Sequence, residues 1–118
     1  MIGLVALLVA LLILPLGAGA AEILQVRGAD LLQLGDQNRS YTVQLACIAV
    51  APEHENEAIA WLRQAAPRYT KVNLRPMGQN QGVLLAMVTP LATAADLGSG
   101  LVAAGLAELQ AGALDPCP

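Results

Sequence analysis

Phenylalanine is absent from the 118 residues of this chain, and its only aromatic side chains are Tyr41, Trp61 and Tyr69. Hydrophobic residues nevertheless make up 56% of the sequence, so we expect a buried core that is almost entirely aliphatic. Basic side chains are also scarce, with six Lys or Arg against nine Asp or Glu. Non-specific binders of single strands combine a basic groove with aromatic stacking platforms. The composition therefore argues against nucleic acid as a partner.

Side chains suited to metal binding or nucleophilic catalysis are few. The single histidine, His54, lies between two glutamates without a nucleophile at a recognisable spacing. The two cysteines, Cys47 and Cys117, match no metal-ligand spacing. In an exported protein they could form one disulfide that ties the tail to the domain. The alternative is a buried thiol at Cys47 and a free Cys117.

The first twenty residues differ in character from the rest of the chain. Residues 2–16 carry no charge, and Ala18-Gly19-Ala20 has the A-x-A form of a signal-peptidase site. An apolar run of this length followed by small residues favours a cleaved signal peptide. No Lys or Arg precedes the run, so an uncleaved membrane anchor stays open. Residues 1–20 therefore predict a chain that is exported or anchored to a membrane.

The remaining chain predicts one domain at residues 21–109, followed by a flexible tail at 110–118. Alternating apolar and polar residues predict five strands, at 22–26, 31–34, 39–48, 69–74 and 82–89. A polar loop is expected at Met77–Gln81.

Two helices are expected between these strands and after them. One lies between Pro52 and Pro67, with glutamates in its first turns that complement the helix dipole. The other covers residues 97–104, with Asp96 as its N-cap and Gly105 as its end. The order of elements predicts a five-stranded Greek-key β-barrel of the OB type with inserted helices, an α+β arrangement.

Three segments, in this order along the chain, resemble motifs of the thermonuclease-like family, the calcium-dependent nucleases related to micrococcal nuclease. Residues 25–32, QVRGADLL, resemble its V-x-D-G-D-T-[VL] hairpin. Residues 44–53, QLACIAVAPE, resemble its R-L-x-x-I-D-x-P-E segment, with one extra residue before the proline. Residues 101–107, LVAAGLA, resemble its L-V-x-x-G-L-A segment. The resemblance spans about residues 22–109 and implies an OB-type barrel.

The resemblance also implies where an active site would lie. Members of the family bind calcium through two aspartates, activate or orient water with a glutamate, and stabilise the transition state with two arginines. Asp30 corresponds to the first metal ligand, and Glu53 lies near the glutamate position. The second metal position holds Ala49, and the two arginine positions hold Gln44 and, near the second, Val83. Calcium would therefore keep Asp30 as its only matched carboxylate ligand.

Losing one charged donor at a transition state typically lowers the rate by about 10²–10³-fold. The resemblance therefore implies a non-catalytic binding or accessory module that needs no cofactor and contacts protein partners, including a membrane complex. The alternative is a weak or altered calcium-dependent nuclease that uses Asp30 and Glu53. A third hypothesis is an oligonucleotide- or oligosaccharide-binding barrel. An uncleaved leader at residues 1–20 would add direct contact with the membrane.

Overall fold

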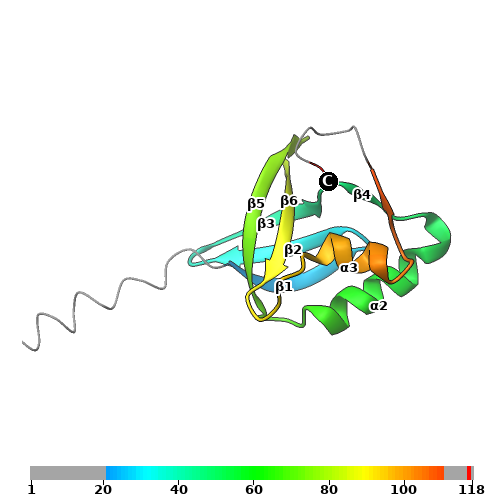
Figure 1. The fold of residues 1–118 in the computed structure, drawn as a ribbon. Helices are drawn as coiled ribbons and strands as arrows, with labels where there is room; N and C mark the ends of the chain where they lie inside the picture. The colour runs from blue at the N-terminus through cyan, green and yellow to red at the C-terminus, as the bar shows by residue number, and fades with distance from the viewer. Residues whose placement is uncertain (1–20, 111–116, 118) are drawn as a thin grey trace, which may run out of the picture.

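The computed structural model describes residues 21–110 and Cys117. Five strands close into a barrel in the order β1-β2-β3-β6-β5 (Figure 1). The strands are β1 (Ala21–Gly28), β2 (Leu31–Asp36), β3 (Arg39–Leu45), β5 (Lys71–Asn80) and β6 (Val83–Pro90). All neighbours run antiparallel except β3 and β6, which pair in parallel. The predicted five-stranded barrel with helices is confirmed, and its topology is OB-fold-like.

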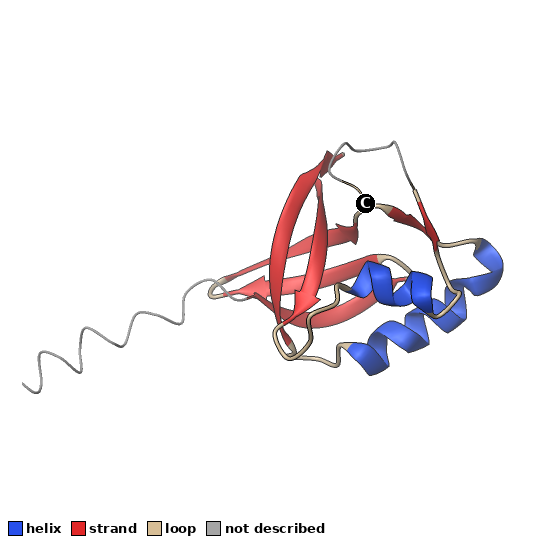
Figure 2. Cartoon of the chain, in the orientation of Figure 1, coloured by secondary structure: helices blue, strands red, loops and turns tan. Residues whose placement is uncertain are grey.

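Two helices pack on one side of the barrel and touch each other (Figure 2). The 3-10 turn η2 (Pro52–His54) leads into α2 (Glu55–Ala65), and α3 (Leu97–Ala103) follows β6. Helix α2 contacts β1 through a stripe that contains the fully buried Ala58 and Leu62, one turn apart. No helix within residues 21–110 is long and apolar enough to cross a bilayer. The leader predicted at residues 1–20 lies outside the described residues.

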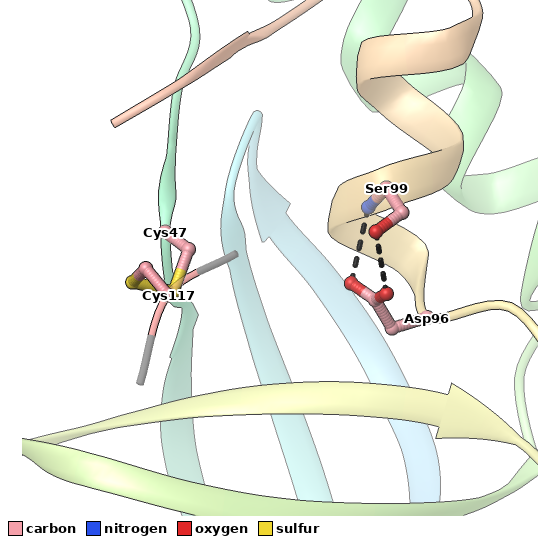
Figure 3. The surroundings of a disulfide bond; sticks show 4 residues. All are labelled: Cys47, Asp96, Ser99 and Cys117. Carbon is pink, nitrogen blue, oxygen red and sulfur yellow. Dashed lines mark hydrogen bonds between the residues drawn. A yellow bond between two sulfur atoms is a disulfide. The ribbon is translucent and has the colours of Figure 1, made fainter. Parts of the chain in front are cut away.

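The N-terminus of α3 is capped as the sequence predicts. The Asp96 carboxylate accepts a hydrogen bond from the Ser99 backbone N–H at 3.0 Å and another from the Ser99 hydroxyl at 2.6 Å (Figure 3). At the other end, Gly105 has a φ of 77°, a conformation in which a side chain would be strained. Helix α3 is therefore held to two turns by signals at both of its ends.

The core inside the barrel is aliphatic, as the composition predicts. Residues that alternate with exposed or half-buried neighbours along the strands point inward and are almost completely buried. The largest fully buried side chains are Ile23, Leu32, Leu34, Val43, Leu62, Val72, Val88 and Leu101. Tyr41 and Trp61 contact this core only from its margin.

The prediction of a loop at Met77–Gln81 is wrong. Strand β5 continues to Asn80, and the turn into β6 consists of Gln81 and Gly82, with φ values of 52° and 82°. Most side chains in this part of β5 are exposed, so the strand lacks the apolar alternation that marks a half-buried strand. A register shift between Pro76 and Gly78 further obscures the pattern.

The prediction of one strand from Arg39 to Ile48 is also wrong. Strand β3 ends at Leu45, and the chain turns at Ala46 and Cys47, where φ of Cys47 is 70°. Strand β4 (Ile48–Ala49) then pairs with β7 (Glu108–Leu109) in a small separate sheet. Apolar residues continue through this turn because both sides of it are buried, so composition alone does not mark it.

Gly100 in α3 leaves room for the ring of Trp61 in α2, since a Cβ built on Gly100 would overlap that ring. We expect Gly100→Ala to lower the free energy of unfolding. Overpacking costs about 1–3 kcal/mol, and the better helix propensity of alanine returns only about 1 kcal/mol. Urea denaturation followed by circular dichroism measures the change. In a Trp61→Leu background the same substitution should stabilise the protein; equal destabilisation in both backgrounds would contradict the packing argument.

Candidate functional site

Asp30 and Gln44, which the sequence places in one candidate site, come together in the structure. Asp30 lies in the turn between β1 and β2, and Gln44 lies near the end of β3. The Gln44 side-chain amide donates a hydrogen bond from Nε2 to Asp30 Oδ2 at 3.1 Å. The Leu45 backbone N–H donates to the Asp30 carbonyl at 2.8 Å. The turn is therefore fixed to β3 through both its main chain and its side chain.

The neighbours of Gln44 across the sheet are leucines. Gln44 is paired with Leu31 of β2 on one side and with Leu85 of β6 on the other. Residues directly opposite on neighbouring strands project to the same side of the sheet. Val83, which the sequence places near the second arginine position, is paired with Asn80 beside the β5–β6 turn instead. The strand position beside Gln44 therefore carries an uncharged aliphatic side chain.

Leu31, Gln44 and Leu85 form a row across three strands. The row belongs to a larger surface on the outside of the barrel, which we call the β2–β3–β6 face. Its residues alternate along the strands with residues that are buried or packed against the core, are half-buried themselves and carry no charge. They are Leu31, Gln33, Thr42, Gln44, Val83, Leu85 and Met87. Arg27 borders the face and donates from Nη1 to Gln33 Oε1 at 2.9 Å, while Gln33 Nε2 donates to Ser40 Oγ at 3.4 Å. The face thus mixes aliphatic groups with amides and hydroxyls.

Ala49 and Glu53 lie in a different place, in a small pocket of about 230 Å³. The pocket is formed by the segment from β4 to η2 and by the chain between α3 and β7. Its lining residues are Ala49, Val50, Ala51, Glu53, His54, Gly105, Leu106, Ala107 and Glu108. His54 Nδ1 is buried there without a hydrogen-bond partner among the described residues. Asp30 and Gln44 do not line this pocket, so the candidate site of the sequence is divided in two.

Possible metal ligands are sparse both around Asp30 and Gln44 and in the pocket that Ala49 and Glu53 line. Within residues 21–110 and Cys117, no three His, Cys, Asp or Glu side chains are grouped so that they could hold one ion. Asp30, the candidate calcium ligand, has the neutral Gln44 amide as its side-chain partner.

The two cysteines form a disulfide in the structure, with their Cα atoms 5.5 Å apart (Figure 3). Cys47 lies in the turn between β3 and β4, and the Gln110 backbone N–H donates to the Cys47 carbonyl at 2.8 Å. Two residues of the predicted flexible tail, Gln110 and Cys117, are thus tied to this turn. The remainder of that tail, 111–116 and 118, lies outside the described residues.

A groove of about 470 Å³ separates the first half of β3 from the β5–β6 hairpin. It arises because β3 pairs with β6 only from Val43 onward. Tyr41, Leu74 and Leu84 line the groove and contact the core, and Arg39 and Gln79 line it as well. Burial raises the pKa of Tyr41 above its ordinary value of 10.0; the negative charge of Asp36 raises it further, and Arg39 opposes the rise.

The raised pKa of Tyr41 predicts a loss of stability in alkali. Folded Tyr41 keeps its proton to a higher pH than unfolded Tyr41, so the unfolded state releases this proton first. Tyr41 therefore contributes no pH dependence well below pH 10.0 and favours unfolding as the pH rises through and above that value. Melting curves of wild type and Tyr41→Phe over this range measure the effect. A Tyr41→Phe protein that loses stability as steeply as wild type would contradict it.

Two features of the site are not visible in the sequence. Leu85 joins the row of Gln44 through the parallel register of β3 and β6, and the His54 pocket depends on β7, a strand of two residues. The motif at residues 101–107 does mark the chain that forms one wall of this pocket. A scan of models of known protein families and a search among curated proteins both find no match to this chain.

Proposed function

We propose that this chain carries a degenerate thermonuclease-like barrel, exported or membrane-attached, which binds a protein partner and does not cleave phosphodiester bonds. The observation that carries the proposal is the hydrogen bond from Gln44 to Asp30. At the position where the resemblance expects an arginine, a neutral amide contacts the carboxylate that the resemblance assigns to calcium. The Asp30–Gln44 pair supports a structural role for both side chains.

Phosphodiester cleavage requires cations where negative charge develops and a metal that holds water and substrate. Gln44 can donate a hydrogen bond but carries no positive charge. Val83, near the second arginine position of the resemblance, has a side chain that neither donates a hydrogen bond nor carries a charge, and the same holds for Leu85, which is paired with Gln44. Ala49, at the second metal position of the resemblance, has no ligand atom in its side chain. Each change removes a different part of the reaction, so their combination favours the loss of activity, although such effects do not simply add.

The β2–β3–β6 face supports a protein as the partner. The centre of a protein–protein interface is depleted in charged residues. Nucleic-acid binding, in contrast, depends largely on Lys and Arg that neutralise phosphates. The face offers leucine, valine and methionine side chains together with the amides of Gln33 and Gln44. It therefore fits a partner that presents apolar groups and hydrogen-bonding groups without a high charge.

Native separation of gently solubilised membranes tests the proposal with a matched pair of variants. We expect the wild-type chain to migrate with a larger complex and Leu85→Lys to migrate at monomer size, because a charge would be buried in the interface. Leu109→Lys, which makes the same change at an exposed leucine outside the face, should migrate like wild type. Migration of the wild-type chain as a free monomer would contradict a partner that contacts this face.

A nuclease assay tests the alternative function. The chain is incubated with DNA or RNA in millimolar calcium, and Asp30→Ala serves as the comparison. The proposal expects that neither protein cleaves the nucleic acid. Calcium-dependent cleavage that Asp30→Ala abolishes would instead support the altered nuclease that uses Asp30 and Glu53.

A further inference from the structure

Exposed apolar side chains gather at the end of the barrel where β1 begins. Tyr69 is 59% exposed and Leu91 is 50% exposed, two of the three large hydrophobic residues that are exposed in the described part of the chain. The Tyr69 backbone N–H donates to the Ile23 carbonyl at 2.6 Å, and the Leu91 backbone N–H donates to the Lys71 carbonyl at 2.9 Å. The loops that follow α2 and β6 therefore meet beside the start of β1 and β5 (Figure 1).

Basic residues lie next to Tyr69 and Leu91. The Arg68 guanidinium carbon lies 4.9 Å from the centroid of the Tyr69 ring, and Lys71 is exposed two residues further on. Arg63 and Arg68 line one hollow of about 250 Å³ beside β1. Glu22 lies opposite Lys71 across the β1–β5 pair and is the one acidic side chain paired directly with this group.

The charge of this end therefore differs from that of the whole protein. Arg63, Arg68 and Lys71 together with Glu22 leave an excess of two positive charges, whereas the whole chain has a net charge of −3. Asp36 and Arg39, which line the same hollow as Glu22 and Lys71, pair across β2 and β3 and offset each other. Three of the six basic residues of the chain thus belong to the end of the barrel that carries Tyr69 and Leu91.

The barrel end that carries Tyr69 and Leu91 is also where the first strand begins. Ala21 is paired with Val72 and Glu22 with Lys71, so β1 begins beside the first residues of β5. Earlier in the sequence, residues 2–16 are uncharged and strongly apolar. Tyrosine is enriched at the headgroup level of bilayers, and Lys and Arg next to a membrane attract anionic lipids.

We propose that the patch formed by Arg63, Arg68, Tyr69, Lys71 and Leu91 rests on an anionic membrane surface. Tyr69 and Leu91 enter the headgroup layer, and the three cations contact lipid phosphates and carboxylates. The patch thereby sets the orientation of the barrel relative to the bilayer. It is separate from the β2–β3–β6 face, so membrane contact does not depend on the protein partner proposed above.

The test places a fluorescent reporter in the patch of the full chain. Tyr69→Trp is combined with Trp61→Phe, so that the only tryptophan lies in the patch, and the protein is incorporated into vesicles that contain phosphatidylserine with brominated acyl chains. Bromine quenches tryptophan at short range. We expect strong quenching of this variant and little quenching of the wild-type chain, whose only tryptophan, Trp61, is partly buried against the core.

Charge reversal then distinguishes membrane contact made by the patch from membrane attachment through the apolar residues 2–16. Arg68→Glu and Lys71→Glu are added to the variant that carries Tyr69→Trp and Trp61→Phe. The ratio of molecules whose patch contacts the membrane to molecules whose patch is free should then fall by about 30-fold, the combined effect of two lost basic contacts with an anionic surface. Arg75→Glu is the matched control, because Arg75 is exposed on the same strand about 13 Å beyond Lys71. The variant with Tyr69→Trp and Trp61→Phe but no charge reversal should lose most of its quenching in vesicles of brominated phosphatidylcholine alone. Equal quenching in both lipids, equal effects of the two charge reversals, or an absence of quenching would each overturn the proposal.

Discussion

Cys117→Ser is expected to lower the free energy of unfolding by about 4 kcal/mol. The disulfide joins residues separated by 70 positions, and in the chain-entropy model a loop of this size restricts the unfolded state by that amount. Because small domains are typically stable by only about 5–15 kcal/mol, the variant should be close to unfolding at elevated temperature. Urea denaturation without reductant measures the difference from wild type.

Reduction provides the control for this prediction. Wild-type protein in excess reductant should have the stability of Cys117→Ser, whereas reductant should leave the variant unchanged. The small β4–β7 sheet and the hydrogen bond from Gln110 to Cys47 also hold the turn in place. A reduced wild-type protein as stable as the oxidised one would show that these contacts suffice without the covalent bond.

Leu101→Ala is expected to cost about 2–5 kcal/mol of unfolding free energy. Leu101 is completely buried where α3 packs on the barrel, so the substitution removes apolar contact and leaves a cavity. Thermal or urea denaturation gives the size of the effect. Leu109→Ala makes the same chemical change at a residue that is 53% exposed, and it should stay within about 0.5 kcal/mol of wild type. Similar losses in the two variants would contradict the assignment of Leu101 to the core.

The result also bears on the motif at residues 101–107. In the structure Leu101, Leu106 and Ala107 are buried, and Gly105 ends the helix with a positive φ. These residues of the motif therefore fix how α3 ends and packs. The motif is therefore compatible with a barrel in which Gln44 and Ala49 hold the positions that the resemblance assigns to an arginine and a metal ligand.

Much of the barrel could be predicted because its core residues follow a simple alternation. Leu32 and Leu34 in β2, and Val43 and Leu45 in β3, point inward, and the residues between them point outward. The caps of α3 were equally clear, since Asp96 and Gly105 act on backbone groups a few residues away. Local signals of this kind need no knowledge of the tertiary structure.

The features that could not be predicted depend on contacts between distant segments. The second half of β5 is exposed on most of its side chains, so only its pairing with β6 marks it as a strand. The break at Cys47 is hidden because the residues on both sides of it are buried. Strands β4 and β7 have two residues each, too few for any periodic pattern.

The candidate site likewise has one part that could be predicted and another that depends on contacts between distant segments. The resemblance predicts that Asp30 and Gln44 lie in one site, and the structure joins them by a hydrogen bond. It does not predict that Ala49 and Glu53 line a separate pocket, because their position depends on the turn that follows β3. Tyr69 and Leu91 are far apart in sequence, and only their hydrogen bonds to neighbouring strands bring them to one end of the barrel.

The link from Cys47 to Cys117 closes the later part of the chain into a covalent ring. The ring contains β4, η2, α2, β5, β6, α3 and β7, whereas β1, β2 and β3 lie outside it. During synthesis Cys117 emerges from the ribosome after every element of the barrel. Ring closure therefore cannot guide the first strand pairings and comes after the chain is already able to join β1 to β5. In a reducing compartment the domain would lack this cross-link and unfold more readily, whereas oxidising conditions would add the cross-link to a barrel that has already formed.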